Sequence, residues 1–230
     1  MNRVLITGAS SGIGLATAKL MLAEGMSVTG VARDFTKTRC DDMQQVELDL
    51  SLLDELPEKL QKNEVLNQNF GCLILNAGYG RFGGIEQFSH QQMRHLFDTN
   101  VVSNLFLLKH YLPEFKRLGA KDIVLIGSEA ALSGAKQGSL YCASKFAIRG
   151  LAQSLRADCA TSDIRVILIN PGAVESDFFN DLHFSPSDGD DYAISTETVA
   201  QAIVNTLKLP RNTVVEEINL QPIKRSFVKS

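Results

Sequence analysis

Residues 3–14 read RVLITGASSGIG, and this stretch decides the fold. Its first half is a short apolar run containing β-branched residues, which is typical of a buried strand. Its second half carries Gly8, Gly12 and Gly14 in a tight turn and leads into a segment that predicts a helix over Gly12–Glu24. A strand, a glycine-rich turn and a helix in this order indicate the first unit of a parallel α/β sheet.

The same alternation of short apolar runs and longer helical patterns continues along the 230 residues. Runs such as CLIL, IVLI and VILI are apolar throughout, which indicates strands buried on both faces by helices. We therefore expect a single α/β domain over residues 1–230, a doubly wound (Rossmann) parallel sheet of about seven strands with helices on both faces. The predicted strands are Val4–Thr7, Ser27–Ala32, Gln45–Leu48, Cys72–Asn76, Asp122–Gly127, Arg165–Asn170 and Val214–Leu220. The predicted helices are Gly12–Glu24, Leu52–Lys62, Gln91–Leu118, Leu140–Thr161 and Thr196–Leu207.

The overall composition is that of an ordinary globular protein, with 44% hydrophobic and 21% charged residues. A net charge of −3 gives no electrostatic reason to expect nucleic acid or an anionic membrane as partner. No apolar run approaches the roughly 20 residues that span a bilayer, and MNRVLITGAS lacks the segments of a signal peptide. The 4 cysteines and 4 histidines show no metal-ligand spacing, so no metal site is expected. These features predict a cytoplasmic protein with free thiols.

The glycine-rich turn has the properties of a phosphate-binding site. Positions without a Cβ let a pyrophosphate approach the backbone, and the following helix directs unpaired N–H groups at it. The hydroxyls of Ser10 and Ser11 can add further donors. The spacing G-x-x-x-G-x-G differs from the standard G-x-G-x-x-G fingerprint, and the GK[ST] of a nucleoside-triphosphate loop is missing. A glycine-rich turn that binds no ligand is the alternative.

The end of the second predicted strand bears on which dinucleotide would bind. An acidic residue at this place usually meets the ribose 2′-hydroxyl of NAD. Here the strand ends VTGVARD, with Ala32 at the acidic position and Arg33 next to it. The planar guanidinium of Arg33 can pair with a 2′-phosphate, which favours NADP(H) over NAD(H). Asp34 can instead serve a hydroxyl, and Arg33 can be a solvated loop charge.

A second cluster of residues has the chemistry of proton transfer. Tyr141 and Lys145 lie one helical turn apart in YCASK, and Ser128 follows the apolar run DIVLIG. Reduction of a carbonyl requires a proton donor, and a free tyrosine has a pKa of about 10. A lysine ammonium on the same helix face is expected to lower that pKa. Ser128, at the carboxyl end of a strand, can hold the substrate oxygen.

Together these motifs resemble the short-chain dehydrogenase/reductase family, and the resemblance covers nearly the whole chain. TGASSGIG is similar to the coenzyme turn of the family, ELDLS to its adenine contact, LNAG to the motif after its fourth strand and PGAVESDF to the segment after its sixth. Leu75, where asparagine is more usual, and Ser11, where some NADP-dependent members have a basic residue, depart from the pattern. The residues then expected at the coenzyme are Gly8, Ser10, Ser11, Gly12, Ile13, Gly14, Arg33, Asp49, Leu50, Asn76, Ala77, Gly78, Tyr141, Lys145, Pro171, Gly172, Val174 and Ser176.

The resemblance also implies a catalytic set of Asn100, Ser128, Tyr141 and Lys145. In DTNVVSN, Asn100 takes the place of an asparagine in a kinked helix that anchors a water. That water links to Lys145 and completes a proton relay from Tyr141 to solvent. The resemblance thus predicts an NADP(H)-dependent alcohol dehydrogenase or carbonyl reductase, and a homodimer or homotetramer.

Other functions remain open from the sequence. One is a dinucleotide-binding sensor or scaffold without catalysis, and another is an epimerase or dehydratase, whose relatives tend to be longer. The ending NTVVEEINLQPIK is similar to the branch with small hydroxy-acid and serine dehydrogenases. Arg81 is either a group that binds an acid or a surface charge. Phe178, Phe179 and Phe184 form either a flap over the substrate or the packing of a short helix.

Overall fold

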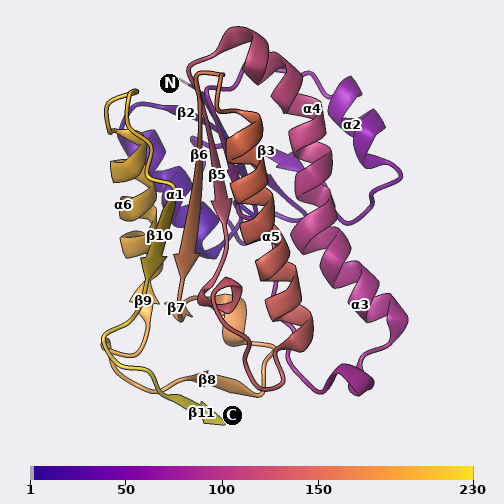
Figure 1. The fold of residues 1–230 in the computed structure, drawn as a ribbon, viewed down its shortest axis with the longest axis vertical. Coiled ribbons are helices and arrows are strands. Elements are labelled where there is room, and N and C mark those ends of the chain that lie inside the picture. The colour runs from indigo at the N-terminus through magenta and orange to yellow at the C-terminus, as the bar shows by residue number, and fades with distance from the viewer. Residues whose placement is uncertain (1–2, 230) are drawn as a thin grey trace.

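The protein is built around one parallel sheet, shown in Figure 1 for the computed structural model, which describes residues 3–229. The sheet strands are β1 (Arg3–Thr7), β2 (Ser27–Ala32), β3 (Gln44–Glu47), β4 (Cys72–Leu75), β5 (Lys121–Ile126), β6 (Ile164–Pro171) and β10 (Glu217–Leu220). They form a 7-stranded sheet in the order β10-β6-β5-β4-β1-β2-β3, with every neighbouring pair parallel. The prediction of a doubly wound parallel sheet of about seven strands is confirmed.

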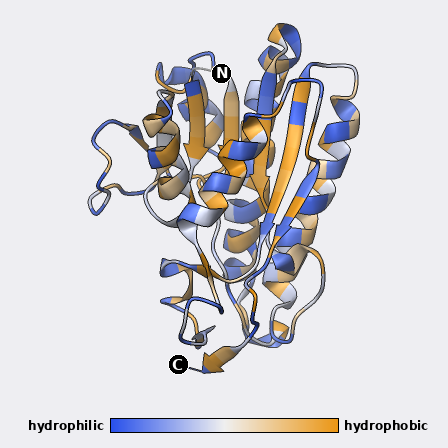
Figure 2. Ribbon diagram, turned by 90° about the vertical axis from the view of Figure 1, so that its left-hand side faces the viewer, coloured by the Kyte–Doolittle hydropathy of each residue, from blue (hydrophilic) through white to orange (hydrophobic). Residues whose placement is uncertain are grey.

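Helices cover both faces of this sheet (Figure 1). They are α1 (Gly12–Ala23), α2 (Leu56–Lys62), α3 (His90–Phe97), α4 (Ser103–Leu118), α5 (Ser139–Asp158) and α6 (Thr196–Leu207). Helices α1 and α6 pack together against one face, and α2, α4 and α5 pack against the other. Figure 2 shows the apolar strands enclosed between helices with hydrophilic outer surfaces.

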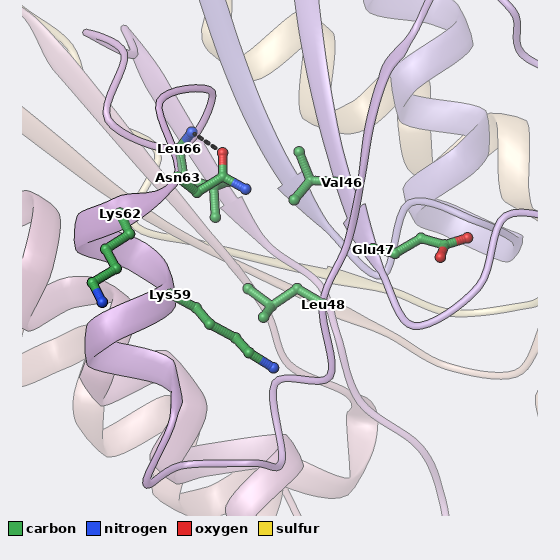
Figure 3. Close-up of a pocket in the computed structure, with 7 residues that line it drawn as sticks. All are labelled: Val46, Glu47, Leu48, Lys59, Lys62, Asn63 and Leu66. Atoms are coloured by element: carbon green, nitrogen blue, oxygen red, sulfur yellow. Dashed lines mark hydrogen bonds between the residues drawn. The ribbon is translucent and has the colours of Figure 1, made fainter.

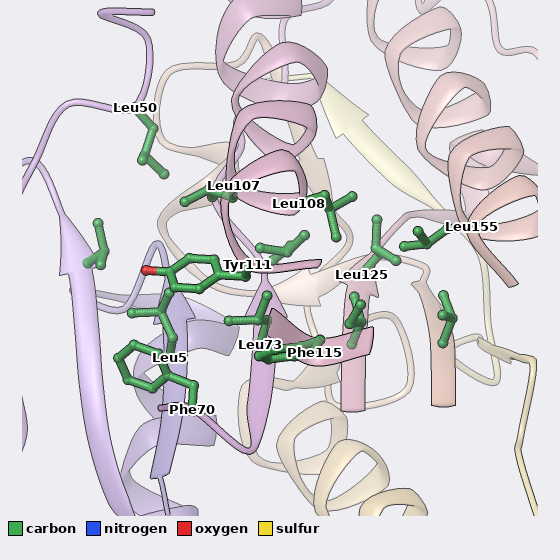
Figure 4. Close-up of a cluster of buried hydrophobic side chains, with 14 of the residues drawn as sticks. Leu5, Leu50, Phe70, Leu73, Leu107, Leu108, Tyr111, Phe115, Leu125 and Leu155 are labelled. Atoms are coloured by element: carbon green, nitrogen blue, oxygen red, sulfur yellow. The ribbon is translucent and has the colours of Figure 1, made fainter. Parts of the chain in front are cut away.

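The two helical layers explain why most residues of the central strands are apolar. Successive side chains of a strand point to opposite faces, so Leu5 joins the core under α4 and α5, whereas Val4 and Ile6 join the core under α1 and α6. Figure 4 shows the first of these cores, where Tyr111 and Phe115 of α4 lie against the sheet. Polar residues that the strands bury have partners: Arg165 of β6, for example, donates to Asp122 of β5 at 2.6 Å.

The winding of the chain reverses between β1 and β4. From β1 the chain moves outward through β2 and β3, and it then returns to β4 on the other side of β1. In open α/β sheets this reversal leaves a crevice at the carboxyl ends of the strands. The glycine turn after β1 and the segment after β4 therefore meet at that end.

Most predicted elements differ from the structure at one end or both, and three of these differences have a structural reason. The helix predicted from Leu52 begins at Leu56, because Asp49 Oδ1 accepts hydrogen bonds from the Ser51 N–H and hydroxyl and forms a turn there. The strand predicted from Val214 begins at Glu217, where pairing with β6 begins. The helix predicted over Gln91–Leu118 is divided into α3 and α4 by a π-helical turn at Asp98–Val102.

Two small strand pairs lie beyond the main sheet. They are β7 (Val174–Glu175) with β9 (Ile194–Ser195) in parallel, and β8 (Phe184–Pro186) with β11 (Phe227–Lys229) in antiparallel. Figure 1 places β8 and β11 beyond the carboxyl ends of the sheet strands. Within residues 3–229, no helix is both long and apolar enough to cross a membrane.

Candidate active site

The glycine turn is held in place by the segment after β4. Asn76 Nδ2 donates hydrogen bonds to the carbonyl oxygens of Thr7 and Gly8 at 3.0 and 3.1 Å. The Thr7 hydroxyl in turn accepts from the N–H groups of Asn76 and Ala77, both at 3.0 Å. Gly8 has φ +65°, and a Cβ on Gly14 would overlap the Gly8 carbonyl oxygen. The turn therefore requires glycine at both places.

The same turn has room for a phosphate at its outer side. Gly12 has φ +54°, and a Cβ there would meet only Ser176, at 3.7 Å. Ser11 is the N-cap of α1 but makes no side-chain capping bond, so the first N–H groups of the helix lack that partner. With Ser10 and Ile13 beside them, these N–H groups fit a dinucleotide pyrophosphate.

The loop after β2 adopts a defined conformation beside the glycine turn. Asp34 accepts hydrogen bonds from the Thr36 N–H and hydroxyl at 2.7 and 3.0 Å, and these bonds hold the pKa of its carboxyl below the usual value. The Thr38 hydroxyl donates to the Ser10 carbonyl oxygen at 3.0 Å, which ties the loop to the turn. Arg33 is exposed at the start of this loop. Its guanidinium is free to face a ligand, whereas the Asp34 carboxylate is already occupied.

The adenine-side residues predicted from ELDLS follow β3. Burial acts to raise the pKa of Asp49, but hydrogen bonds from Ser51 and the nearby charge of Arg33 lower it below the ordinary value overall. Leu50 is buried in the core instead of facing the crevice. Asp49 and Arg33 therefore lie within electrostatic range of each other, and the place of Leu50 at the coenzyme stays a prediction.

The predicted catalytic side chains meet at the carboxyl end of β5. Ser128 lies two residues after the end of that strand. Tyr141 and Lys145 lie on α5, and each of these residues is 6% exposed. Tyr141 hydrogen-bonds with the Ser128 side chain. Lys145 Nζ donates to the Ile126 carbonyl oxygen at 3.0 Å and lies 5.7 Å from the centre of the Tyr141 ring. A phenol, a hydroxyl and an ammonium group are thus brought to one place.

Burial dominates the titration of this cluster. It raises the pKa of Tyr141 well above its ordinary value, and the hydrogen bond with Ser128 opposes that shift without overcoming it. It also lowers the pKa of Lys145 to about 8. The spacing Tyr-x-x-x-Lys predicts a lowered pKa for Tyr141, and the structure gives a raised one. Burial of the phenol has the larger effect, and the Lys145 ammonium donates to the Ile126 carbonyl oxygen. Tyr141 is therefore held as a neutral phenol, the form that donates a proton.

The pKa of Lys145 has a measurable consequence for stability. Between about pH 8 and the ordinary lysine pKa of 10.5 the unfolded chain binds more protons, so the free energy of unfolding rises with pH. From about pH 8 to about pH 10, we expect the free energy of unfolding of the wild-type protein to rise by about 2 kcal/mol relative to that of Lys145→Met, which lacks the titrating amine. Urea unfolding at several pH values measures it, and a difference that stays flat over this window contradicts the shift.

Asn100 connects this cluster to the segment after β4. It lies in the π-helical turn Asp98–Val102 and is 1% exposed. Its side-chain amide accepts from the Tyr79 N–H and donates to the Tyr79 carbonyl oxygen, both at 3.0 Å, and also donates to Ser144 at 3.3 Å. A Cβ on Gly78 would lie 3.1 Å from Asn100 Oδ1 and 3.9 Å from Lys145 Nζ. Because Gly78 has no side chain, the space between these two groups is not filled by one.

The segment after β6 completes the ring of predicted residues. Pro171 ends β6, Gly172 donates its N–H to the Leu220 carbonyl oxygen, and Val174 begins β7. The Ser176 hydroxyl donates to the Val174 carbonyl oxygen at 3.3 Å and accepts from the N–H of the residue two positions on. Because Ser176 lies across from Gly12, this segment borders the crevice on the side opposite β4.

A polar network next to Ser128 was missed from the sequence. Asn170, which is 0% exposed, accepts from the Ser128 N–H at 3.3 Å and donates to Glu217 and Asn219 on β10 at 2.8 and 2.9 Å. Arg149 of α5 pairs with Glu217 at 3.2 Å. The signal was the asparagine that follows the apolar run VILI, in the strand beside the one that leads to Ser128. The network fixes the backbone of Ser128 relative to three elements.

A separate hollow of about 270 Å³ lies between β3 and α2 (Figure 3). Its Lys59 is paired with Glu55 at 2.7 Å, so that charge is already balanced. The hollow is lined by Val46, Glu47, Leu48, Lys59, Lys62, Asn63 and Leu66. It shares no residue with the cluster around Tyr141 and takes no part in the site.

Comparison with known proteins agrees with the fold and the motifs. The short chain dehydrogenase family model matches residues 2–184, so the chain belongs to this family of oxidoreductases that act on alcohols and carbonyls. The chain is 25% identical over 229 residues to an uncharacterized oxidoreductase of Staphylococcus saprophyticus, with 95% of this chain and 96% of that protein covered. It is 31% identical over 198 residues to human 17-beta-hydroxysteroid dehydrogenase type 1, covering 80% of this chain and 60% of that protein.

A solved structure is similar over the whole length. The alcohol dehydrogenase from the archaeon Thermococcus sibiricus, complexed with 5-hydroxy-NADP, superimposes with a TM-score of 0.86 at 26% identity. The alignment covers 98% of this chain and 99% of that one. The fold of this family binds a nicotinamide dinucleotide, which matches the residues at the glycine turn.

Proposed function

We propose that this protein is an NADP(H)-dependent oxidoreductase that moves a hydride between the nicotinamide and a small carbonyl or secondary alcohol. The observation that carries the proposal is the meeting of Tyr141, Ser128 and Lys145 at the carboxyl end of β5, close to the glycine turn. The carbonyl carbon gains a hydride and its oxygen gains a proton, and NADPH becomes NADP⁺. In this proposal, residues 1–230 form one catalytic domain.

Each member of the cluster has a separate task in this reaction. Tyr141 donates its phenol proton to the substrate oxygen, or accepts that proton in the reverse direction. Ser128 donates a hydrogen bond to the same oxygen and so polarises the carbonyl. Lys145 restores the proton of Tyr141 and orients the coenzyme ribose, and Asn100 supports the path to solvent. When bound, the coenzyme supplies or accepts the hydride.

The preference for NADP(H) rests on the loop after β2. The Asp34 carboxylate is turned to Thr36, which leaves it poorly placed for a ribose hydroxyl, and Arg33 is exposed beside it. A guanidinium pairs with a phosphate through two parallel hydrogen bonds. The Thermococcus alcohol dehydrogenase, itself complexed with 5-hydroxy-NADP, adds support from a relative.

Arg33→Ala tests this preference. We expect the Kd for NADPH to rise by about 10- to 100-fold, because a charge-assisted pair to the 2′-phosphate is lost, while the Kd for NADH changes by less than about threefold. Titration calorimetry with both coenzymes measures the two values. Arg117→Ala, at an exposed arginine near the end of α4, is the matched control and should leave both unchanged. Equal weakening of both coenzymes by Arg33→Ala would count against a 2′-phosphate contact.

The proposal extends to assembly and location. Leu105 of α4 and Phe146 of α5 are both 44% exposed, and a second copy packed against these helices would cover them without blocking the carboxyl ends of the strands. We propose a homodimer or homotetramer in the cytoplasm, with a small molecule as the substrate and neither nucleic acid nor membrane as partner. Light scattering coupled to gel filtration tests the assembly.

A further inference from the structure

The ring of Tyr141 is bordered by phenylalanines from separate parts of the chain. Phe82, in the loop after β4, lies 5.2 Å from the Tyr141 ring between centroids, and Phe178 lies at 5.7 Å. Phe184 of β8 packs edge-on against Phe82 at 5.0 Å. A Cβ on Gly80 would overlap the Phe178 ring, so the loop after β4 has no side chain at the one place where Phe178 needs room.

The C-terminal strand brings one more ring to this group. Phe227 of β11 lies 5.7 Å from Phe184 and 6.3 Å from Phe179 between centroids. Antiparallel pairing of β11 with β8 places it there (Figure 1), and an ion pair between Lys224 and Asp191 at 2.7 Å fixes the preceding segment. We call Phe82, Phe178, Phe179, Phe184 and Phe227 the aromatic cluster.

The aromatic cluster is not a closed core. Four of its members are half-buried, and the fifth, Phe227, is 48% exposed. Rings that pack edge-on leave apolar faces and edges on which another aromatic group can pack at similar distances. The cluster therefore offers an apolar surface that begins at the proton donor and extends away from it.

The charges around the proton donor disfavour an anionic substrate. Burial is the main cause of the raised pKa of Tyr141, and the charge of Glu129 adds to the shift, so a negative charge lies within electrostatic range of the phenol. Burial raises the pKa of Tyr79, and the charge of Arg81, the candidate acid-binding group, opposes that shift, so Arg81 lies within electrostatic range of Tyr79. A carboxylate next to the reacting carbonyl would have to exchange water for the rings of Phe82 and Phe178, which border Tyr141, and this raises the free energy of binding it.

We infer that the substrates are neutral carbonyl compounds with an aromatic group next to the carbonyl, and that small keto acids or hydroxy acids are not the substrates. This inference rests on the oxidoreductase function proposed above. In the reduction the carbonyl carbon receives the hydride of NADPH, its oxygen receives the proton of Tyr141, and the aromatic group packs on the cluster.

Four compounds with a ketone next to a carboxyl group or its ester separate the effect of the aromatic group from the effect of the negative charge. They are ethyl benzoylformate, benzoylformate, ethyl pyruvate and pyruvate. We expect kcat/KM to be at least about tenfold higher for the phenyl compound than for the methyl compound of each pair, and about tenfold higher for each ester than for its acid. Higher values for the acids, or for the methyl compounds, would overturn the substrate class while leaving the oxidoreductase function intact. Coenzyme binding without turnover of any of the four would also overturn it.

Phe227→Ala tests the role of the cluster itself. The ratio of kcat/KM for ethyl benzoylformate to that for ethyl pyruvate should fall about tenfold, because part of the apolar surface is removed. Ile223→Ala, at a residue of the same tail that is 89% exposed, is the control and should leave the ratio unchanged. A ratio that is the same in Phe227→Ala and wild type contradicts the inference. Circular dichroism melting of both variants shows that the fold is kept.

Discussion

Replacing Tyr141 by phenylalanine should lower kcat by a factor on the order of 10³ or more, because the group that donates the proton is removed and general acid catalysis contributes about 10²- to 10⁴-fold. The Kd for NADPH should change by less than about threefold, since the ring and its packing against Phe82 and Phe178 remain. Stopped-flow kinetics with NADPH and a reducible ketone measures the first value, and titration calorimetry measures the second.

The control for this variant is Tyr111→Phe, which removes a phenol of the core. The Tyr111 hydroxyl donates to the Leu66 carbonyl oxygen at 2.8 Å. This hydrogen bond belongs to the core and takes no part in the proposed proton transfer. Its loss should reduce the free energy of unfolding by about 1 kcal/mol and leave kcat within about twofold. A Tyr141→Phe enzyme that retains turnover would show that Tyr141 is not the proton donor.

Replacing Gly14 by alanine should abolish coenzyme binding, with the Kd rising by more than about 100-fold. The added Cβ would overlap the Gly8 carbonyl oxygen and press on Asn76 Nδ2, so the turn must shift and its N–H groups no longer converge. We also expect a loss of stability of about 1–3 kcal/mol, as for other overpacked sites. Calorimetric titration with NADPH well below the melting temperature measures the affinity.

Gly150→Ala is the matched control, because a Cβ at Gly150 in the middle of α5 would meet no atom within 4 Å. That variant should gain about 0.5–1 kcal/mol of stability and bind NADPH like the wild-type protein. If Gly14→Ala also bound NADPH with unchanged affinity, the glycine turn would not be the coenzyme site.

The central sheet could be predicted from the sequence because its signal is local. Runs such as VLI in β1 and CLIL in β4 are short, apolar throughout and followed by helical patterns, and burial on both faces permits little else. The residues at the carboxyl ends follow from this topology, since parallel strands bring together whatever comes directly after them. Ser128 and the glycine turn were found in this way.

The features that depend on tertiary contacts could not be predicted. The β8–β11 pair is only 3 residues long on each side and has no propensity signal, so nothing in the local sequence placed Phe227 beside Phe184. The same holds for the network of Asn170, whose partners Glu217 and Asn219 are 47 and 49 residues away. The pKa of Tyr141 depends on how deeply α5 buries it, and spacing along a helix contains no such information.

The most direct test of the oxidoreductase function follows an isotope from coenzyme to product. NADPH with deuterium at C4 of the nicotinamide, prepared in both stereochemical forms, is incubated with the wild-type protein and a panel of aryl ketones, alkyl ketones and aldehydes. We expect one of the two forms to transfer its deuterium to the carbinol carbon of at least one product, and Tyr141→Phe to transfer almost none, as measured by mass spectrometry. Coenzyme binding with no deuterium in any product of either form would contradict the proposed function.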